Sequence, residues 1–487
     1  MCDAFIPDQR RILGGKESMV PDHTCIEVVN GIEVCSHSEW FGIHADQSDP
    51  GDNLLMERRG KRMTALLFIS MIVLLIVGVP IAFVLCGSSI IAILSTGDIH
   101  NAIVIQRMFS GSGSFTLLAI PFFVLAGNLM SSGGISKRLV NLCNSLFGHI
   151  SGGLAMVAII TCAFFAAISG SSAATAAAVG TIIIPEMLKH KYDKDFAGAT
   201  VASSAELGVI IPPSIGLIQY GVATGTSISD LFMAGFLPGI FICLVLCVVA
   251  HFLCKKQGFE PSKKATRQEK IQAFKDAILA ILMPVIILGG IYSGVFTPTE
   301  AAVIAVFYGL IVGVFVYKEI KLSDIPRILT DSAITMSTVL LIMSASTIFG
   351  WILTKLQIPQ AVAKGFLGIS ASKYIFLLLV NVLLLFIGMF CEAGAAMVIL
   401  APLLAPVAQT LGIDLVHFGI IMMANLAIGM MTPPVGVNLY VVCDTAKVKI
   451  EGMFPYLVKY FLALVAGVLI ITYVPQLSLL LVNLFGQ

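Results

Sequence analysis

Long apolar segments dominate the chain from Met63 to its C-terminal end. The stretch MTALLFISMIVLLIVGVPIAFVL (63–85) is long enough for a first membrane helix, because about 20 apolar residues cross the hydrocarbon layer of a bilayer. Hydrophobic residues make up 57% of the 487 residues and charged residues only 12%, whereas a soluble domain carries about 25% charged residues. The sequence therefore predicts an all-α polytopic membrane protein.

Several classes of function are excluded by charge and by motif. A formal net charge of +1 gives no reason to expect nucleic-acid binding. No GxxxxGK[ST], HExxH or GxSxG motif occurs, so we expect neither nucleotide hydrolysis nor an intramembrane enzyme. The eleven cysteines form no CxxC pair and no zinc spacing, and we interpret them as small apolar residues. We therefore expect no enzyme activity, no cofactor and no transition metal.

Charge and polarity divide the chain into four segments. Residues 1–62 are polar and predict either a disordered extension or sequence upstream of the true start near Met56 or Met63. The Lys/Arg-rich loop 255–274 is predicted to be cytoplasmic, because cytoplasmic loops carry an excess of Lys and Arg. This loop separates a first membrane repeat (63–254) from a second (275–487).

Two proline pairs interrupt apolar runs at corresponding places, in Gly208–Ser214 (GVIIPPS) and Gly429–Val435 (GMMTPPV). A proline pair removes two backbone donors and must break a helix. A membrane tolerates the unpaired backbone groups only where protein or a water-filled cavity supplies partners. Two such breaks in the two halves of a chain indicate the binding site of a transporter.

An internal repeat follows from the same proline pairs. A shift of 221 residues carries Pro212 onto Pro433 and Gly208 onto Gly429. It also superposes two interruptions, at Ser169–Ser172 and at Cys391–Gly394, which predict re-entrant hairpins over 152–188 and 374–408. We expect the repeats to be inverted, which would bring the two hairpin tips together near mid-bilayer. Similarity alone does not give their orientation.

The tips and breaks supply groups suited to an anion and a cation. A half-helix start at the first tip favours a carboxylate, and freed carbonyls with hydroxyls such as that of Thr432 suit Na⁺. Tight packing of small residues is the alternative explanation for 169–180. The predicted sodium- and substrate-binding residues at the first tip and break are Ser169, Gly170, Ser171, Ser172, Glu206, Gly208, Ile211, Pro212, Pro213 and Ser214. Those at the second are Glu392, Gly394, Gly429, Thr432, Pro433, Pro434, Gly436 and Asn438.

With these residues in view, the chain resembles the large membrane subunit (DctM-like permease) of tripartite ATP-independent periplasmic (TRAP) transporters over about 63–487. The matching stretches include AIPFFVLAGNLM (119–130), ISGSSAATAAAVGTIIIPEM (168–187), AELGVIIPPSIGLIQYG (205–221) and GIDLVHFGIIMMANLAIGMMTPPVGVNLYV (412–441). The resemblance implies an elevator-type secondary transporter in the bacterial inner membrane, driven by a Na⁺ gradient.

The same resemblance implies partners and a substrate class. It implies a small four-helix membrane subunit on a separate chain and a periplasmic protein that delivers an organic acid, such as a C4-dicarboxylate or a sugar acid. An alternative is a stand-alone Na⁺-coupled carboxylate or ion transporter of similar architecture. Uptake by this chain without a binding protein would favour that alternative.

Overall fold

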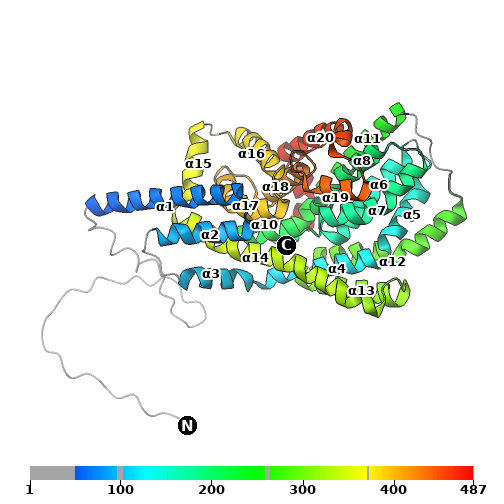
Figure 1. Cartoon of the computed structure of the whole chain (residues 1–487), viewed down its shortest axis with the longest axis horizontal. Coiled ribbons are helices and arrows are strands. Elements are labelled where there is room, and N and C mark those ends of the chain that lie inside the picture. The colour runs from blue at the N-terminus through cyan, green and yellow to red at the C-terminus, as the bar shows by residue number, and fades with distance from the viewer. Residues whose placement is uncertain (1–49, 96–101, 151, 258–263, 370–371, 486–487) are drawn as a thin grey trace, which may run out of the picture. The chain divides into compact units, whose positions relative to one another are not determined.

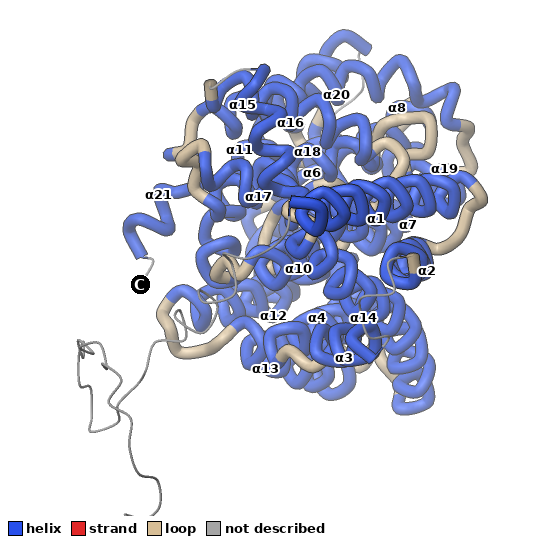
Figure 2. Tube along the Cα trace, turned by 90° about the vertical axis from the view of Figure 1, so that its left-hand side faces the viewer, coloured by secondary structure: helices blue, strands red, loops and turns tan. Residues whose placement is uncertain are grey.

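The computed structural model describes residues 50–95, 102–150, 152–257, 264–369 and 372–485. Helices are the only regular elements among these residues, as Figure 2 shows. Eight helical stretches of the described chain are long and apolar enough to cross a membrane. The prediction of an all-α polytopic membrane protein is therefore confirmed. Most of the predicted polar extension (1–62) lies outside the described residues.

Prolines divide the chain at both ends of the membrane part more finely than the sequence predicts. The chain separates into Met1–Arg59 and Gly60–Gln487, and α1 (Pro50–Ile76) includes residues of both.

The expectation of one helix over 63–85 is wrong, because Gly78 has a φ of +83° and Pro80 precedes α2 (Ile81–Leu94). At the other end, α20 (Ile450–Tyr473) and α21 (Gln476–Phe485) are separated at Pro475.

The first half of the membrane part continues through a hairpin and an interrupted segment. Its elements are α3 (Ala102–Ser112), η1 (Phe115–Leu118), α4 (Ala119–Ser132), α5 (Ile135–Phe147), α6 (Gly153–Ser169), α7 (Ser172–Lys189), α8 (Lys194–Ala205), α9 (Leu207–Ile210), α10 (Ile215–Thr224) and α11 (Ile228–Gln257). The first predicted hairpin corresponds to α6 and α7, which pack along each other. The first proline pair lies between α9 and α10.

The second half begins with two helices that start in capping boxes. Thr297 Oγ1 accepts from the Glu300 amide at 3.3 Å, and Glu300 Oε2 accepts from the Thr297 amide at 2.8 Å. Glu300 therefore serves the start of its helix. The elements are α12 (Arg267–Tyr292), α13 (Pro298–Ile311), the π-helical η2 (Val312–Val316), η3 (Leu322–Asp324), α14 (Ile325–Lys355), α15 (Ile358–Ile369), α16 (Lys373–Gly388), α17 (Ala393–Thr410), α18 (Leu415–Met430) and α19 (Val437–Ala446).

Helix boundaries in the two halves correspond under the 221-residue shift. The shift carries both ends of α7 onto α17, and it carries α6, α8, α10 and α11 onto α16, α18, α19 and α20 to within a few residues. The hairpins differ, however, because α6 and α7 pack closely along each other, whereas α16 and α17 contact each other much less. α17 is also long and apolar enough to span a membrane by itself.

The two halves exchange equivalent contacts. The half-helix α10 packs against α17, and its counterpart α19 packs against α7 (Figure 1). In the same way α8 packs against α20, and α18 packs against α11. Two copies of a unit related by a twofold axis make this reciprocal pattern, which supports the predicted duplication. α8 and α18 are buried along nearly their whole length and form the centre of the core.

Candidate functional site

The first hairpin tip is a tight turn that depends on glycine. α6 ends at Ser169, Gly170 has a φ of +63°, and Ser171 caps α7 by accepting from the Ala174 amide at 3.4 Å. A side chain at Gly170 would be strained in this left-handed conformation. Ser169 Oγ and Thr175 Oγ1 form a hydrogen bond of 2.9 Å. The tip therefore presents several hydroxyl groups within the first turn of α7.

The first tip lies directly against the first proline break. A Cβ atom at Gly170 would be 2.7 Å from the Pro213 carbonyl oxygen, and one at Gly208 would be 2.6 Å from the Ser171 carbonyl oxygen. Pro212 is buried beside them, and Ser214 Oγ caps α10 by accepting from the Leu217 amide at 3.3 Å. The backbone of the first tip therefore lies in close contact with the backbone of the first break.

Ile211 differs from the other predicted residues of the first break. Its side chain packs against Gly239 of α11, where a Cβ atom would be 2.4 Å from Ile211 Cγ1. The backbone at Ile211 is extended, with φ −77° and ψ 127°. The Ile211 side chain therefore faces α11, and only the backbone of this residue belongs to the break.

A buried polar cluster joins the first tip to the second half of the chain. Glu206 is fully buried, and its Oε1 accepts from Asn438 Nδ2 at 2.7 Å. Asn438 Oδ1 in turn accepts from Ser172 Oγ at 3.4 Å. Glu206 Oε2 is buried and has no hydrogen-bond partner within the described chain. Since a buried polar group without a partner costs free energy, this oxygen is a candidate contact for a bound ion or solute.

Asn438 belongs to a different tip from the one that the sequence predicts. The prediction grouped it with the second tip, because it lies four residues beyond the Pro433–Pro434 pair. The structure places it on α19, against Ser172 and Glu206 at the first tip. The reason is the exchange of contacts between halves, since α19 packs on α7 rather than on α17.

The second tip combines a carboxylate cap with close glycine packing. Glu392 is exposed, and its Oε2 accepts from the Ala395 amide at 3.0 Å at the start of α17. A Cβ atom at Gly429 would lie 2.5 Å from the Cα of Gly388. The Gly436 amide, at a residue with φ +57°, donates to the Met389 carbonyl at 3.3 Å. The second break therefore also lies against the end of its own hairpin.

The two breaks differ in their access to the outside of the protein. Every residue from Ile211 to Ser214 is buried, whereas Pro433 is half-buried and Pro434 is exposed. Thr432 is likewise half-buried, and its Oγ1 donates to the Ile428 carbonyl at 2.9 Å. A solute therefore reaches the second break more readily than the first.

Sequence reasoning missed two polar residues at the tips. Thr175 hydrogen-bonds to Ser169, as described above. Gln219 of α10 is 2% exposed, and its Oε1 has no hydrogen-bond partner among the described residues. A glutamine in an apolar membrane segment soon after a proline pair is the signal that would have identified it.

Two further asparagines join helices without contacting the residues of either tip through their side chains. Asn128 Nδ2 donates to Ser332 Oγ at 2.8 Å between α4 and α14. Asn425 Nδ2 donates to Asn381 Oδ1 between α18 and α16. Amides in such positions stabilise helix association in membranes, and these residues serve as structural references for the tips.

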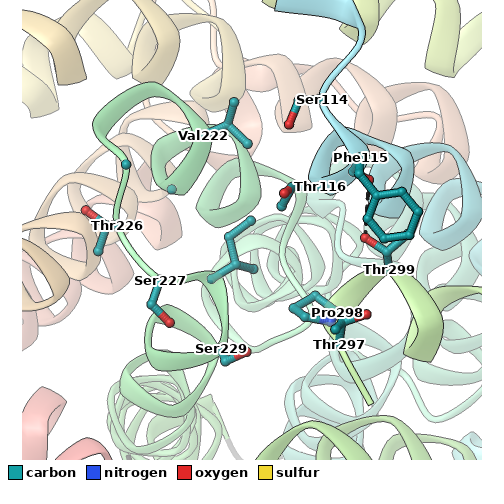
Figure 3. Close-up of a pocket in the computed structure, with 13 residues that line it drawn as sticks. Ser114, Phe115, Thr116, Val222, Thr226, Ser227, Ser229, Thr297, Pro298 and Thr299 are labelled. Carbon is teal, nitrogen blue, oxygen red and sulfur yellow. Dashed lines mark hydrogen bonds between the residues drawn. The ribbon is translucent and has the colours of Figure 1, made fainter. Parts of the chain in front are cut away.

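A separate pocket of about 550 Å³ opens at the turns that precede α4, α11 and α13 (Figure 3). Its hydroxyl groups come from Ser114, Thr116, Thr226, Ser227, Ser229, Thr297 and Thr299. Thr299 Oγ1 donates to the Phe115 carbonyl at 3.4 Å. None of the predicted sodium- or substrate-binding residues lines this pocket.

The pocket and the basic loop lie at opposite ends of one long helix. α11 runs for 30 residues from the pocket to the loop that precedes α12, which corresponds to about 45 Å. That length exceeds the hydrocarbon thickness of about 30 Å. The pocket therefore lies at the other end of α11 from the predicted loop 255–274, of which the structure assigns 255–257 to α11 and 267–274 to the start of α12.

Labelling of single cysteines is expected to place these two sites on opposite faces. An impermeant maleimide should label Ser227→Cys in intact spheroplasts, and it should label Gln268→Cys only after permeabilisation, because basic loops remain cytoplasmic. Both positions are exposed. The unsubstituted chain, with its native cysteines, is the control. Labelling of Gln268→Cys in intact spheroplasts would contradict the predicted orientation.

Comparison with known proteins gives one consistent result. The family model described as "Tripartite ATP-independent periplasmic transporter, DctM component" matches residues 68–477. The chain is 42% identical to the sialic acid TRAP transporter large permease protein SiaM of Vibrio cholerae, over 85% of this chain and 96% of that protein. It is 38% identical to the C4-dicarboxylate TRAP transporter large permease protein DctM of Rhodobacter capsulatus, over 87% of this chain and all of that protein.

The chain is also similar to a longer relative and to one solved transporter structure. The chain is 44% identical to the isethionate TRAP transporter permease protein DctMQ of Oleidesulfovibrio alaskensis, over 83% of this chain but only 64% of that protein. The solved structure of the YdaH transporter of Alcanivorax borkumensis superposes with a TM-score of 0.56 at 18% identity, over 76% of this chain and 86% of that one. At this identity the second likeness concerns the fold alone.

Proposed function

Because the chain belongs to the DctM family of tripartite ATP-independent periplasmic transporters, we propose that it couples the import of an organic acid to a Na⁺ gradient. As a TRAP large permease it is a membrane transporter of a binding-protein-dependent system and not an enzyme. The named substrates of its relatives, C4-dicarboxylate, sialic acid and isethionate, are all organic anions. The proposed substrate class follows from them.

The buried cluster of Glu206, Asn438 and Ser172 carries the proposal. It places a carboxyl group, an amide and a hydroxyl where interrupted helices from both halves meet. Oxygen atoms of these kinds are the ligands that a hard cation prefers. A carboxyl group buried in a transporter is functional by default, because its burial is otherwise costly.

The proposed partners are a small four-helix membrane subunit and a periplasmic substrate-binding protein, and the proposed location is the bacterial inner membrane. The tripartite character of the family supports these proposals. The DctMQ relative, of which the chain matches 64%, is longer than this chain and leaves room for a further membrane component in that protein. We propose an elevator-type movement in which the two tips and two breaks travel together, supported by the exchanged contacts between halves.

Uptake in proteoliposomes tests the proposed function. The chain is reconstituted with its small subunit and binding protein, and uptake of a labelled organic acid is measured with a Na⁺ gradient and after its collapse. We expect uptake that requires the gradient and both partners. Uptake by the chain alone would support the alternative of a stand-alone transporter. Equal uptake without Na⁺ would contradict the proposed coupling.

Ser172→Ala and Thr432→Ala are expected to weaken the Na⁺ dependence of uptake. Each variant removes one neutral oxygen ligand, and a hydrogen bond or ligand of this kind is worth about 1 kcal/mol, which corresponds to about a fivefold change in affinity. The Na⁺ concentration at half-maximal uptake is the measurement. Thr330→Ala removes an exposed hydroxyl of α14 as a control. Unchanged Na⁺ titrations in both tip variants would exclude these hydroxyls from the sites.

A further inference from the structure

The side chain of Gln219 is buried beside the second hairpin tip and has an unpartnered oxygen. It lies on α10, five residues beyond the first break, and is 2% exposed. Its Oε1 is buried without a hydrogen-bond partner within the described part of the chain. Because an unpaired buried carbonyl costs about 1–3 kcal/mol, the arrangement indicates that this oxygen has a partner during function.

Gln219 points at the start of α17. A Cβ atom at Gly394, the second residue of that 18-residue helix, would lie 2.3 Å from Gln219 Oε1 and 3.0 Å from Glu392 Oε2. The amide oxygen and the carboxylate oxygen therefore converge on the same side of Gly394. Only a glycine leaves this space open.

The first tip contains a matching arrangement from the opposite half. There Asn438 of α19 accepts a hydrogen bond from Ser172, the first residue of α7. Here the amide of Gln219 on α10 lies next to Gly394, the second residue of α17. Each interrupted segment thus supplies an amide to the hairpin of the other half, in agreement with the exchanged packing.

The two arrangements differ in the source of the carboxyl group. At the first tip it is Glu206, which comes from the interrupted segment and binds the Asn438 amide. The 221-residue shift carries Glu206 onto Ala427, so the second interrupted segment has no counterpart. Glu392 of the hairpin supplies the carboxylate instead, and Gln219 Oε1 is left as a second acceptor beside it.

Two neighbouring acceptor oxygens, of which Glu392 Oε2 accepts from the Ala395 amide and Gln219 Oε1 has no partner among the described residues, favour a cation. Carboxylate and amide oxygens are the ligands of hard cations, whereas a substrate carboxylate would be repelled by Glu392. We infer that Gln219 Oε1 and the Glu392 carboxylate together bind Na⁺ at the second tip, so that the cation bridges the two halves. The inference rests on the proposed Na⁺ coupling, and it assigns a ligand from the first half to the second site.

Thermal unfolding of the purified full chain in detergent tests this inference without transport. NaCl is titrated at constant ionic strength with choline chloride, because a ligand that binds only the folded state raises its stability in proportion to the logarithm of its concentration. We expect Na⁺ to stabilise the wild type. Gln219→Leu should require at least about tenfold more Na⁺ for the same shift, since it removes a ligand oxygen.

A matched variant and a second substitution complete the experiment. Asn128→Leu removes another interhelical amide, which donates to Ser332 of α14 and not to a residue of the second tip, and it should leave the Na⁺ titration unchanged. Gln219→Asn keeps the amide but withdraws it by one methylene, and it should also weaken Na⁺ binding. A wild-type titration in either folded Gln219 variant would overturn the inference. No response to Na⁺ in the wild type would instead contradict the proposed coupling.

Discussion

The double variant Glu206→Met, Asn438→Leu is expected to fold at least as stably as the wild type and to lose Na⁺-driven uptake. Glu206 is fully buried with one oxygen unpartnered, and Asn438 is its only partner among the described side chains. Replacing both members of a buried polar pair with apolar residues of similar volume is often neutral or stabilising, by about 1–4 kcal/mol. The cluster would then be retained for transport at a cost in stability.

Loss of uptake should be large in this variant. With Glu206 as the proposed cation ligand, its removal forfeits about 3 kcal/mol of binding free energy, which corresponds to about a hundredfold in affinity. Unfolding temperature in detergent and initial uptake rate in proteoliposomes are the two measurements. Ser172 loses its acceptor in the variant, but its hydroxyl can bond to nearby backbone instead.

A second interhelical pair provides the control for the double variant. Asn128→Leu, Ser332→Ala removes the hydrogen bond of 2.8 Å between α4 and α14. Its uptake should stay close to that of the wild type, because neither residue lies at a tip or break. Wild-type uptake by the Glu206→Met, Asn438→Leu variant would show that the cluster is only a structural contact.

Gly208→Ala is expected to lower both uptake and stability. A Cβ atom there would lie 2.6 Å from the Ser171 carbonyl oxygen and 2.6 Å from Thr175 Oγ1. The first of these atoms is backbone, so the tip and the break must separate. Overpacking of this kind costs about 1–3 kcal/mol, and a shift of the tip by even a fraction of an ångström disturbs the ligand geometry. We expect uptake to fall by at least about tenfold.

Gly289→Ala is the matched helical control for Gly208→Ala. No atom lies within 4 Å of a Cβ placed at Gly289 in α12. Alanine should therefore stabilise that helix, by up to about 1 kcal/mol. Unfolding temperatures of the two variants should change in opposite directions. If both variants change the unfolding temperature in the same direction, the close contact between the first tip and the first break is contradicted.

The backbone preferences of proline and glycine explain which parts of the fold were predictable from the sequence. Prolines and glycines dictate their own backbone geometry, so the interruption at Ser169–Ser172 and the two proline breaks appear where the sequence predicts them. The same rule was overlooked at Pro80, where a run of hydrophobic residues suggested one continuous helix. Hydrophobicity predicts that a segment is buried in lipid, but it does not predict how many pieces that segment forms.

Contacts between distant segments explain what was missed in the site. Asn438 lies beside Pro433–Pro434 in sequence, but it acts at the first tip because α19 packs on α7. Gln219 was not among the predicted site residues, because its position at the second tip depends on a contact with Gly394, which is far away in the chain. Neither contact has a local sequence signal, although a glutamine soon after a proline pair in an apolar segment marks Gln219 itself. Only the tertiary arrangement reveals which half-helix meets which hairpin.

Reciprocal packing of α10 on α17 and of α19 on α7 has a consequence for the history of the chain. Neither predicted repeat, expressed by itself, would possess a complete copy of the proposed ion site, since each lacks the amide that the other repeat provides. Divergence of one segment is therefore constrained by the other, as happens between the protomers of an obligate dimer. Co-expressed fragments split within 258–263 should regain transport only as a pair.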